Sequence, residues 1–162
     1  MVRLIMGANG AGKTKQLIDL IHNAVEAENG SVVCMEPSAD MTYNISYNVR
    51  LVNASEYSVD SFECLRGFIS GLYAGNYDIS HVFVDNLCKI AGTSDLMAVE
   101  KFLNWLERFS EEEQRQVHRD HHGGRISGHR GYAELSVSIF VRASAPCLWA
   151  GSRFLSRKRS II

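Results

Sequence analysis

The segment that most constrains how this chain can fold is GANGAGKT, at residues 7–14. It matches the pattern G-x-x-x-x-G-K-[ST] in full, and it directly follows a short apolar run, VRLIM, at residues 2–6. After it, apolar residues recur at helical spacing as far as residue 29. A buried strand, a glycine-rich turn and a helix, in this order, are what a phosphate-binding loop requires.

The motif acts through its backbone and through two side chains. Glycines let the backbone curl so that several N–H groups point at phosphate oxygens, and the following helix presents its positive N-terminal end to the same charge. A lysine at the end of the motif neutralises the phosphates, and the hydroxyl after it coordinates Mg²⁺. We therefore predict that the chain binds ATP and Mg²⁺. The predicted binding residues are Gly7, Ala8, Asn9, Gly10, Ala11, Gly12, Lys13 and Thr14.

The first 113 residues alternate between predicted strands and predicted helices. Strands are expected at residues 2–6, 31–35, 49–54 and 81–86, and helices at residues 14–29, at residues 62–75 and after Ser94, which we expect to cap the last of them. Such alternation predicts an α/β fold, a P-loop NTPase-like parallel sheet with helices on both faces.

Two acidic residues follow predicted strands. Asp85 directly follows the apolar residues of the strand-like segment HVFVDN, and we expect its carboxylate at the carboxyl edge of the sheet, where it would hold Mg²⁺ together with Thr14. The next residue, Asn86, can orient a water molecule but cannot accept its proton, so hydrolysis is expected to be slow or to depend on a partner. Glu36, at the predicted carboxyl end of the second strand, could reach the same edge, but because it precedes Pro37 we favour a solvated loop carboxylate over a catalytic role.

Length and composition indicate one globular domain. The chain has 162 residues, of which 46% are hydrophobic, and no apolar run is long enough to span a bilayer. No secretory signal is evident at the N-terminus, so we expect a cytoplasmic protein without a membrane partner. The cysteines, at positions 34, 64, 88 and 147, include no C-x-x-C pair, which favours free thiols over a zinc site.

The N-terminal two-thirds of the chain resemble a family of small bacterial P-loop ATP-binding proteins, some of them labelled twitching-motility ATPases. The resemblance covers residues 1–113, rests on RLIMGANGAGKTKQLIDL, VRLVNASEYSVDS and YDISHVFVDNLCKI, and implies ATP binding. A fainter similarity links GAGKTKQLI and SVVCMEPSADMTY to thymidine kinases, whose Asp-Glu pair and zinc-binding cysteines are absent here. Three functions stay open: an ATPase, a nucleotide-dependent binding or sensor module, and a small-molecule phosphotransferase.

Residues 114–162 differ from the rest of the chain. Up to residue 114 there are 8 Lys and Arg against 16 Asp and Glu, whereas from Arg115 onward there are 9 against 2. A metal site and a nucleic-acid arm both stay open for this tail, but the sequence favours neither, because no Cys or paired carboxylate joins its histidines and no aromatic residue alternates with its arginines before Tyr132. The histidines considered are His118, His121, His122 and His129. The alternation of strands and helices also stops after Glu113, so we expect a sheet shortened by one or more C-terminal strands.

A one-nucleotide frame slip near residues 111–114 would account for the tail. When the codons of residues 117–124, VHRDHHGG, are read one nucleotide later, they permit FTVTITAD, a β-branched strand of the kind that the pattern lacks. We therefore predict a nucleotide-binding domain at residues 1–113 and a non-native or disordered tail at residues 114–162. Sequencing the coding DNA is expected to restore the strand; an intact frame, with the tail peptide found by mass spectrometry, would contradict the prediction.

Overall fold

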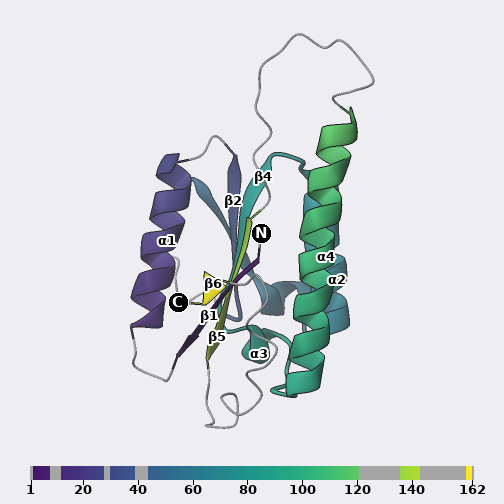
Figure 1. Cartoon of the computed structure of the whole chain (residues 1–162). Helices are drawn as coiled ribbons and strands as arrows, with labels where there is room; N and C mark the ends of the chain where they lie inside the picture. The colour runs from purple at the N-terminus through teal and green to yellow at the C-terminus, as the bar shows by residue number, and fades with distance from the viewer. Residues whose placement is uncertain are drawn as a thin grey trace.

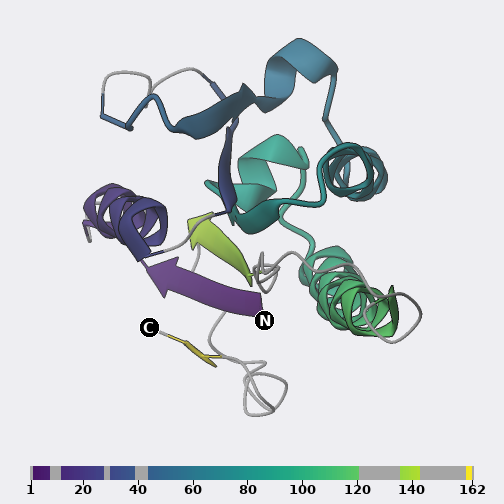
Figure 2. The same ribbon diagram turned by 90° about the horizontal axis from the view of Figure 1, so that it is seen from above.

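The computed structural model of the chain describes residues 2–7, 12–27, 30–38, 44–120, 136–142 and 160–161. These residues form a parallel sheet with helices on both of its faces (Figures 1 and 2). The predicted α/β class and the parallel sheet are therefore confirmed. No helix in the described part of the chain is both long enough and apolar enough to cross a membrane.

The elements predicted from the first 113 residues are present, with ends shifted by a few residues. In chain order the elements are β1 (Val2–Gly7), α1 (Lys13–Ala27), β2 (Ser31–Glu36), β3 (Val49–Asn53), the 3-10 helix η1 (Ala54–Tyr57), α2 (Phe62–Gly75), β4 (Ile79–Val84), α3 (Leu87–Ile90), α4 (Leu96–Asp120), β5 (Ser136–Arg142) and β6 (Ser160–Ile161).

The six strands lie in the order β3-β2-β4-β5-β1-β6, and every neighbouring pair is parallel. Their carboxyl ends therefore all lie at one edge of the sheet, the lower edge in Figure 1, and α1 begins at that edge. Loops at the carboxyl edge of a parallel sheet are the usual place for a ligand in α/β proteins. The topology thus brings the chain that follows β1, β2 and β4 to one region.

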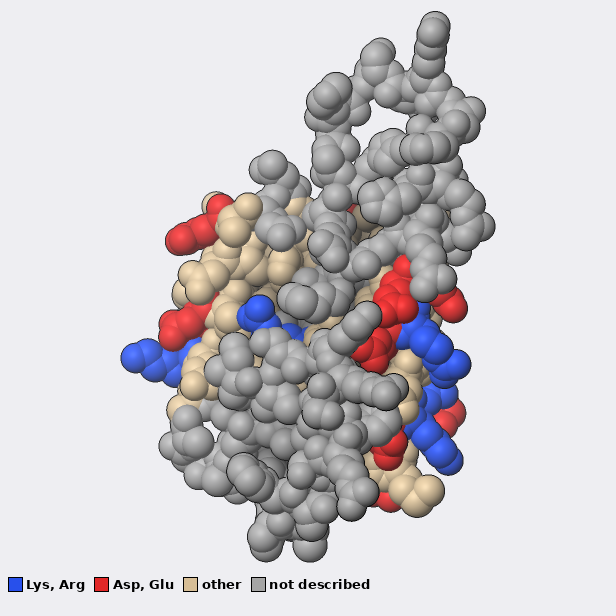
Figure 3. Space-filling model, in the orientation of Figure 1, with Lys and Arg blue, Asp and Glu red and all other residues tan. Residues whose placement is uncertain are grey.

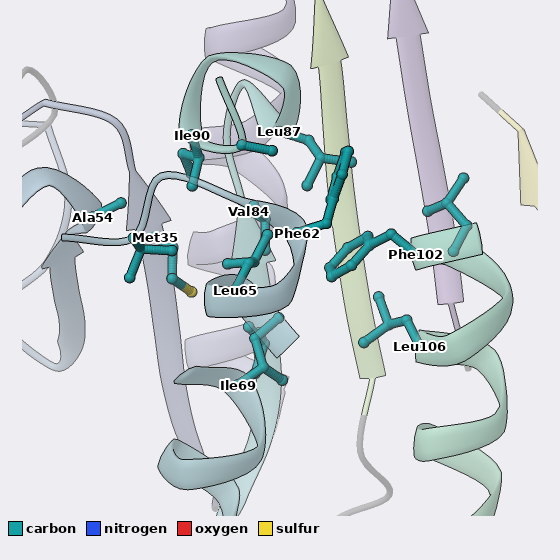
Figure 4. Close-up of a cluster of buried hydrophobic side chains, with 14 of the residues drawn as sticks. Met35, Ala54, Phe62, Leu65, Ile69, Val84, Leu87, Ile90, Phe102 and Leu106 are labelled. Atoms are coloured by element: carbon teal, nitrogen blue, oxygen red, sulfur yellow. The ribbon is translucent and has the colours of Figure 1, made fainter. Parts of the chain in front are cut away.

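The two faces of the sheet have separate hydrophobic cores. On one face, α1 contributes Leu17 and Ile21, which pack with Cys34 of β2 and Phe83 of β4. On the other face, α2, α3 and α4 cover the larger core (Figure 4). The buried residues labelled there are Met35, Ala54, Phe62, Leu65, Ile69, Val84, Leu87, Ile90, Phe102 and Leu106. Because side chains alternate between the faces of a strand, neighbours such as Cys34 and Met35 belong to different cores.

The caps of the longer helices come from short polar side chains. Ser61 precedes α2 and its hydroxyl accepts a hydrogen bond from the N–H of Cys64 at 3.2 Å. For α4 the expected cap, Ser94, is wrong by one residue: the Asp95 carboxylate accepts from the N–H of Met97 at 3.2 Å. The Asp95 carbonyl also accepts the first helical bond, from Val99. Asp95 directly precedes α4, and the side chain of the residue before a helix is the one that reaches the free N–H groups of its first turn.

The structure also places parts of the predicted tail. Helix α4 continues beyond residue 113 to Asp120, and β5 lies between β4 and β1, pairing with both. The sheet thus contains a strand from the segment where a missing strand was expected, and so it does not stop after β4. The frame slip itself concerns the coding DNA and stays a prediction.

Candidate functional site

The glycine-rich motif lies at the turn from β1 into α1. Gly7 is the last residue of β1 and Lys13 is the first residue of α1. Thr14 is exposed in the first turn of that helix. The other predicted binding residues, Ala8, Asn9, Gly10 and Ala11, and the side chain of Lys13 lie outside the part of the chain that the structure describes. The described residues place a strand directly before the motif and a helix at its end, as the motif requires.

Gly12 is the residue at which the chain turns into α1. Its φ is 73°, in the left-handed region where a side chain is strained. Its carbonyl accepts the N–H of Gln16 at 3.1 Å, so Gly12 also opens the helical hydrogen-bonding pattern. The first N–H groups of a helix have no partner within the helix and attract anions. The N-terminus of α1 therefore offers N–H groups to a negatively charged ligand at the carboxyl edge of the sheet.

Asp85 lies at the same edge, immediately after β4. Its N–H donates to the carbonyl of Met35 at 2.9 Å, which extends the pairing of β4 with β2 by one residue. Strand β5 separates β4 from β1, so the two strands are roughly 10 Å apart. Val84 and Leu4 both pair with Ile139, so Asp85 lies at about the same height along the strand direction as Ile5 of β1. The motif begins two residues after Ile5, closer to the carboxyl edge of the sheet.

The Asp85 side chain lies on the face of the sheet that α1 covers. Cys34 belongs to the core under α1, and burial raises the pKa of its thiol, with a further rise from the nearby negative charges of Glu36 and Asp85. Glu36 lies two residues after Cys34 and Asp85 two residues after Phe83, and both of these core residues face α1. The turn into α1 and two carboxylates thus share one edge and one face of the sheet.

Glu36 is not the solvated loop carboxylate that the sequence led us to expect. It is the last residue of β2, and only 1% of its surface is exposed. Pro37 ends the strand, but the strand includes the residue before it, since a residue that precedes proline favours extended backbone. The alternation of Val32, Cys34 and Glu36 along β2 is the signal that could have placed this carboxylate on the α1 face.

Asn86 occupies a special backbone conformation. Its φ and ψ are both 52°, in the left-handed region, and its carbonyl accepts the N–H groups of Lys89 at 2.8 Å and Ile90 at 3.2 Å, which begins α3. Asparagine is among the few residues with side chains that adopt this conformation readily. The choice of asparagine after Asp85 therefore has a structural reason that is independent of any catalytic role.

A metal cage made of protein side chains alone is not found in the described region. No group of three or more His, Cys, Asp or Glu side chains there could hold a metal ion. Of the tail histidines, the side chain of His118 and all of His121, His122 and His129 lie outside the described residues. In the space-filling view, acidic and basic side chains are intermixed over the side of the molecule formed by α2 and α4 (Figure 3).

The environments of the cysteines predict their reactivity. Cys34 is buried and its pKa is raised, so at pH 8 it carries less of the thiolate that reacts with alkylating agents, whereas Cys64 is exposed. In native protein treated with iodoacetamide, we expect labelling of Cys64 and protection of Cys34 until denaturant is added, as measured by peptide mapping. Equal labelling of both residues in native protein would contradict the placement of Cys34 under α1.

The comparisons with known proteins add no family assignment. No protein-family model matches the chain, and no curated protein matches it significantly.

Proposed function

We propose that this chain is a P-loop protein that binds Mg-ATP and hydrolyses it slowly or in response to a partner. The observation that carries the proposal is the placement of the complete motif: GANGAGKT lies where a buried parallel strand turns into a helix, and Gly12 at that turn has a φ of 73°. The backbone accounts for glycine at position 12, whereas it does not require the lysine and threonine that follow. Their presence points to phosphate chemistry.

Each element of the motif has a role in this proposal. The backbone from Gly7 to Gly12 and the N-terminus of α1 would donate N–H groups to phosphate oxygens. Lys13 would bring a positive charge to the β- and γ-phosphates, and the exposed hydroxyl of Thr14 would lie beside it.

The oxygen donors at this edge fit Mg²⁺. Thr14 offers a hydroxyl and Asp85 a half-buried carboxylate, and both are the hard oxygen ligands that Mg²⁺ prefers. Mg²⁺ is commonly held by one or two protein groups together with phosphates and water, so a site with few protein ligands suits it. When bound, the ion would neutralise charge on the phosphates.

ATP is the nucleotide that the sequence favours. The guanine-reading motif N-K-x-D does not occur in the chain, and the resemblance in the first 113 residues is to ATP-binding proteins. The parallel sheet, with α1 on one face and the other helices opposite, is consistent with membership in the P-loop NTPase class, and we include that membership in the proposal.

Titration of the full chain with Mg-ATP tests the proposal. We expect saturable binding with preference for ATP over GTP, together with a low rate of phosphate release. Saturable binding with no phosphate release would instead support a sensor module, and transfer of phosphate to thymidine would support a phosphotransferase. A folded chain that binds no nucleotide would contradict the proposal.

A further inference from the structure

We propose that Glu36 is the residue that orients the attacking water during ATP hydrolysis. This inference rests on the proposed function and assigns a further residue to the same site. It also answers the difficulty raised by Asn86, which cannot supply a carboxylate after Asp85.

Glu36 and Asp85 are neighbours across adjacent parallel strands. Met35 pairs with Val84 in the register of β2 and β4, and the hydrogen bond from the Asp85 N–H to the Met35 carbonyl continues that pairing. The residue after each partner is therefore a carboxylate, and the two stand side by side at the carboxyl edge. One carboxylate can hold the metal while its neighbour serves the water.

The two carboxylates lie on the same side of the sheet as the turn into α1. Residues two apart along a strand share a face, so Glu36 follows Cys34 and Asp85 follows Phe83, both of which pack under α1. The effect of both negative charges on Cys34 agrees with this placement. The N-terminus of α1 and Glu36 thus approach the space beyond the sheet edge from the same face.

Glu36 is buried, and it is the only acidic residue with a buried side chain in the part of the chain that the structure describes. It is 1% exposed, whereas Glu63 at the start of α2 is an exposed residue. Withdrawing a carboxylate from water costs several kcal/mol unless other groups compensate. A buried glutamate is therefore unusual at a position that an amide or an apolar side chain could fill. A buried acceptor at the same edge and on the same face of the sheet as the N-terminus of α1 is suited to holding one water molecule in a fixed position.

Asn86 does not compete for this role. Its left-handed backbone and its contacts to α3 account for its presence, as described above. The carboxylate that assists the water therefore comes from β2, the strand next to β4, and not from the residue that follows Asp85.

The chemical step that Glu36 assists is a direct displacement. The Glu36 carboxylate accepts a hydrogen bond from the water, aims its lone pair at the γ-phosphorus and takes up the proton that the water loses. A bond forms between the water oxygen and phosphorus while the bond from phosphorus to the β–γ bridging oxygen breaks, and that electron pair leaves with ADP. The proton held by Glu36 then passes to an oxygen of the transferred phosphoryl group, so the products are ADP and dihydrogen phosphate and the Glu36 carboxylate is restored.

Substitution of Glu36 by glutamine tests the assignment, because it keeps the size of the side chain and removes its charge. We expect Glu36→Gln to lower kcat by about a hundredfold or more, in the range found for groups that assist proton movement, while the Kd for Mg-ATP measured by calorimetry changes less than about threefold. Glu63→Gln, an equally conservative change at an exposed position, is the control and should leave both quantities unchanged.

A second variant guards against misfolding. Glu36→Asp keeps the charge but withdraws it by one methylene, and we expect intermediate turnover with wild-type ATP affinity in a protein whose circular dichroism matches the wild type. We also expect Asn86→Glu to leave turnover no faster than in the wild type.

The possible failures can be told apart. A wild type that binds no nucleotide contradicts the proposed function itself. If the wild type binds ATP but releases no phosphate, or if Glu36→Gln turns over ATP as fast as the wild type, the role of Glu36 is wrong while ATP binding stands. Loss of ATP binding in folded Glu36→Gln would also overturn the role, because it would place the residue in nucleotide binding.

Discussion

Replacing Lys13 with alanine is expected to weaken the binding of Mg-ATP by about a hundredfold or more. In the proposed complex the ammonium donates to oxygens of two phosphates, and a hydrogen bond to a charged group contributes about 1.5–3 kcal/mol. Two such bonds give at least about 3 kcal/mol, which is roughly a factor of a hundred in Kd. Calorimetric titration of the wild type and the variant under the same salt conditions measures the difference.

Lys15→Ala provides a matched control for this experiment. Lys15 lies two residues further along α1 and its side chain is exposed, so the change removes the same charge from the same helix without touching the motif. Alanine is a good helix former, so neither variant should unfold α1. Equal affinity in Lys13→Ala and Lys15→Ala would show that binding does not depend on the motif.

Much of the fold could be predicted from local patterns. The apolar run before the motif and the helical spacing after it give β1 and α1, because each pattern reflects burial of one face of an element. The same reasoning gives α2, with its core residues Phe62, Leu65 and Ile69. Ends of elements were less certain: both Ser94 and Asp95 suit a cap, and only the path of the chain decides which side chain reaches the free N–H groups.

The composition of the site depended on tertiary structure. The position of Asp85 at the carboxyl edge could be predicted, because the sequence shows a strand-like apolar run directly followed by this aspartate. For Glu36 the sequence favours a solvated carboxylate over a catalytic one because Pro37 follows it, whereas its burial depends on the pairing of β2 with β4 and on the placement of α1. Asn86 was interpreted chemically, whereas its φ of 52° is a backbone property that sequence spacing does not contain.

The strand order was also beyond the reach of local patterns. Neighbouring strands in the sequence need not be neighbours in the sheet, and β5, from the far end of the chain, lies between β4 and β1. Its position sets the distance between Asp85 and the motif, because one strand more or less changes that spacing by about 5 Å. The geometry of the proposed metal site therefore depends on a strand outside the segment that carries the motifs.

Replacing Phe102 with alanine is expected to lower the free energy of unfolding by about 3–5 kcal/mol. Phe102 of α4 is fully buried, and the centroid of its ring lies 5.1 Å from the ring centroid of Phe62 in α2 (Figure 4). The ring centroid of Trp105 lies 5.8 Å from that of Phe102. Truncation removes this apolar contact and leaves a cavity that the packed elements fill only in part. Since a domain of this size is stable by about 5–15 kcal/mol, the change removes a large share of the total.

Urea unfolding followed by circular dichroism measures this loss as a lower midpoint with an unchanged slope. Met97→Ala, in the first turn of the same helix, is the control: its side chain is 65% exposed, so we expect a change below about 0.5 kcal/mol. A small effect of Phe102→Ala, close to that of Met97→Ala, would mean that α4 does not pack on the sheet as described. The two variants together therefore test whether α4 closes the face of the sheet opposite α1, on which the position of β4 and its carboxylate depends.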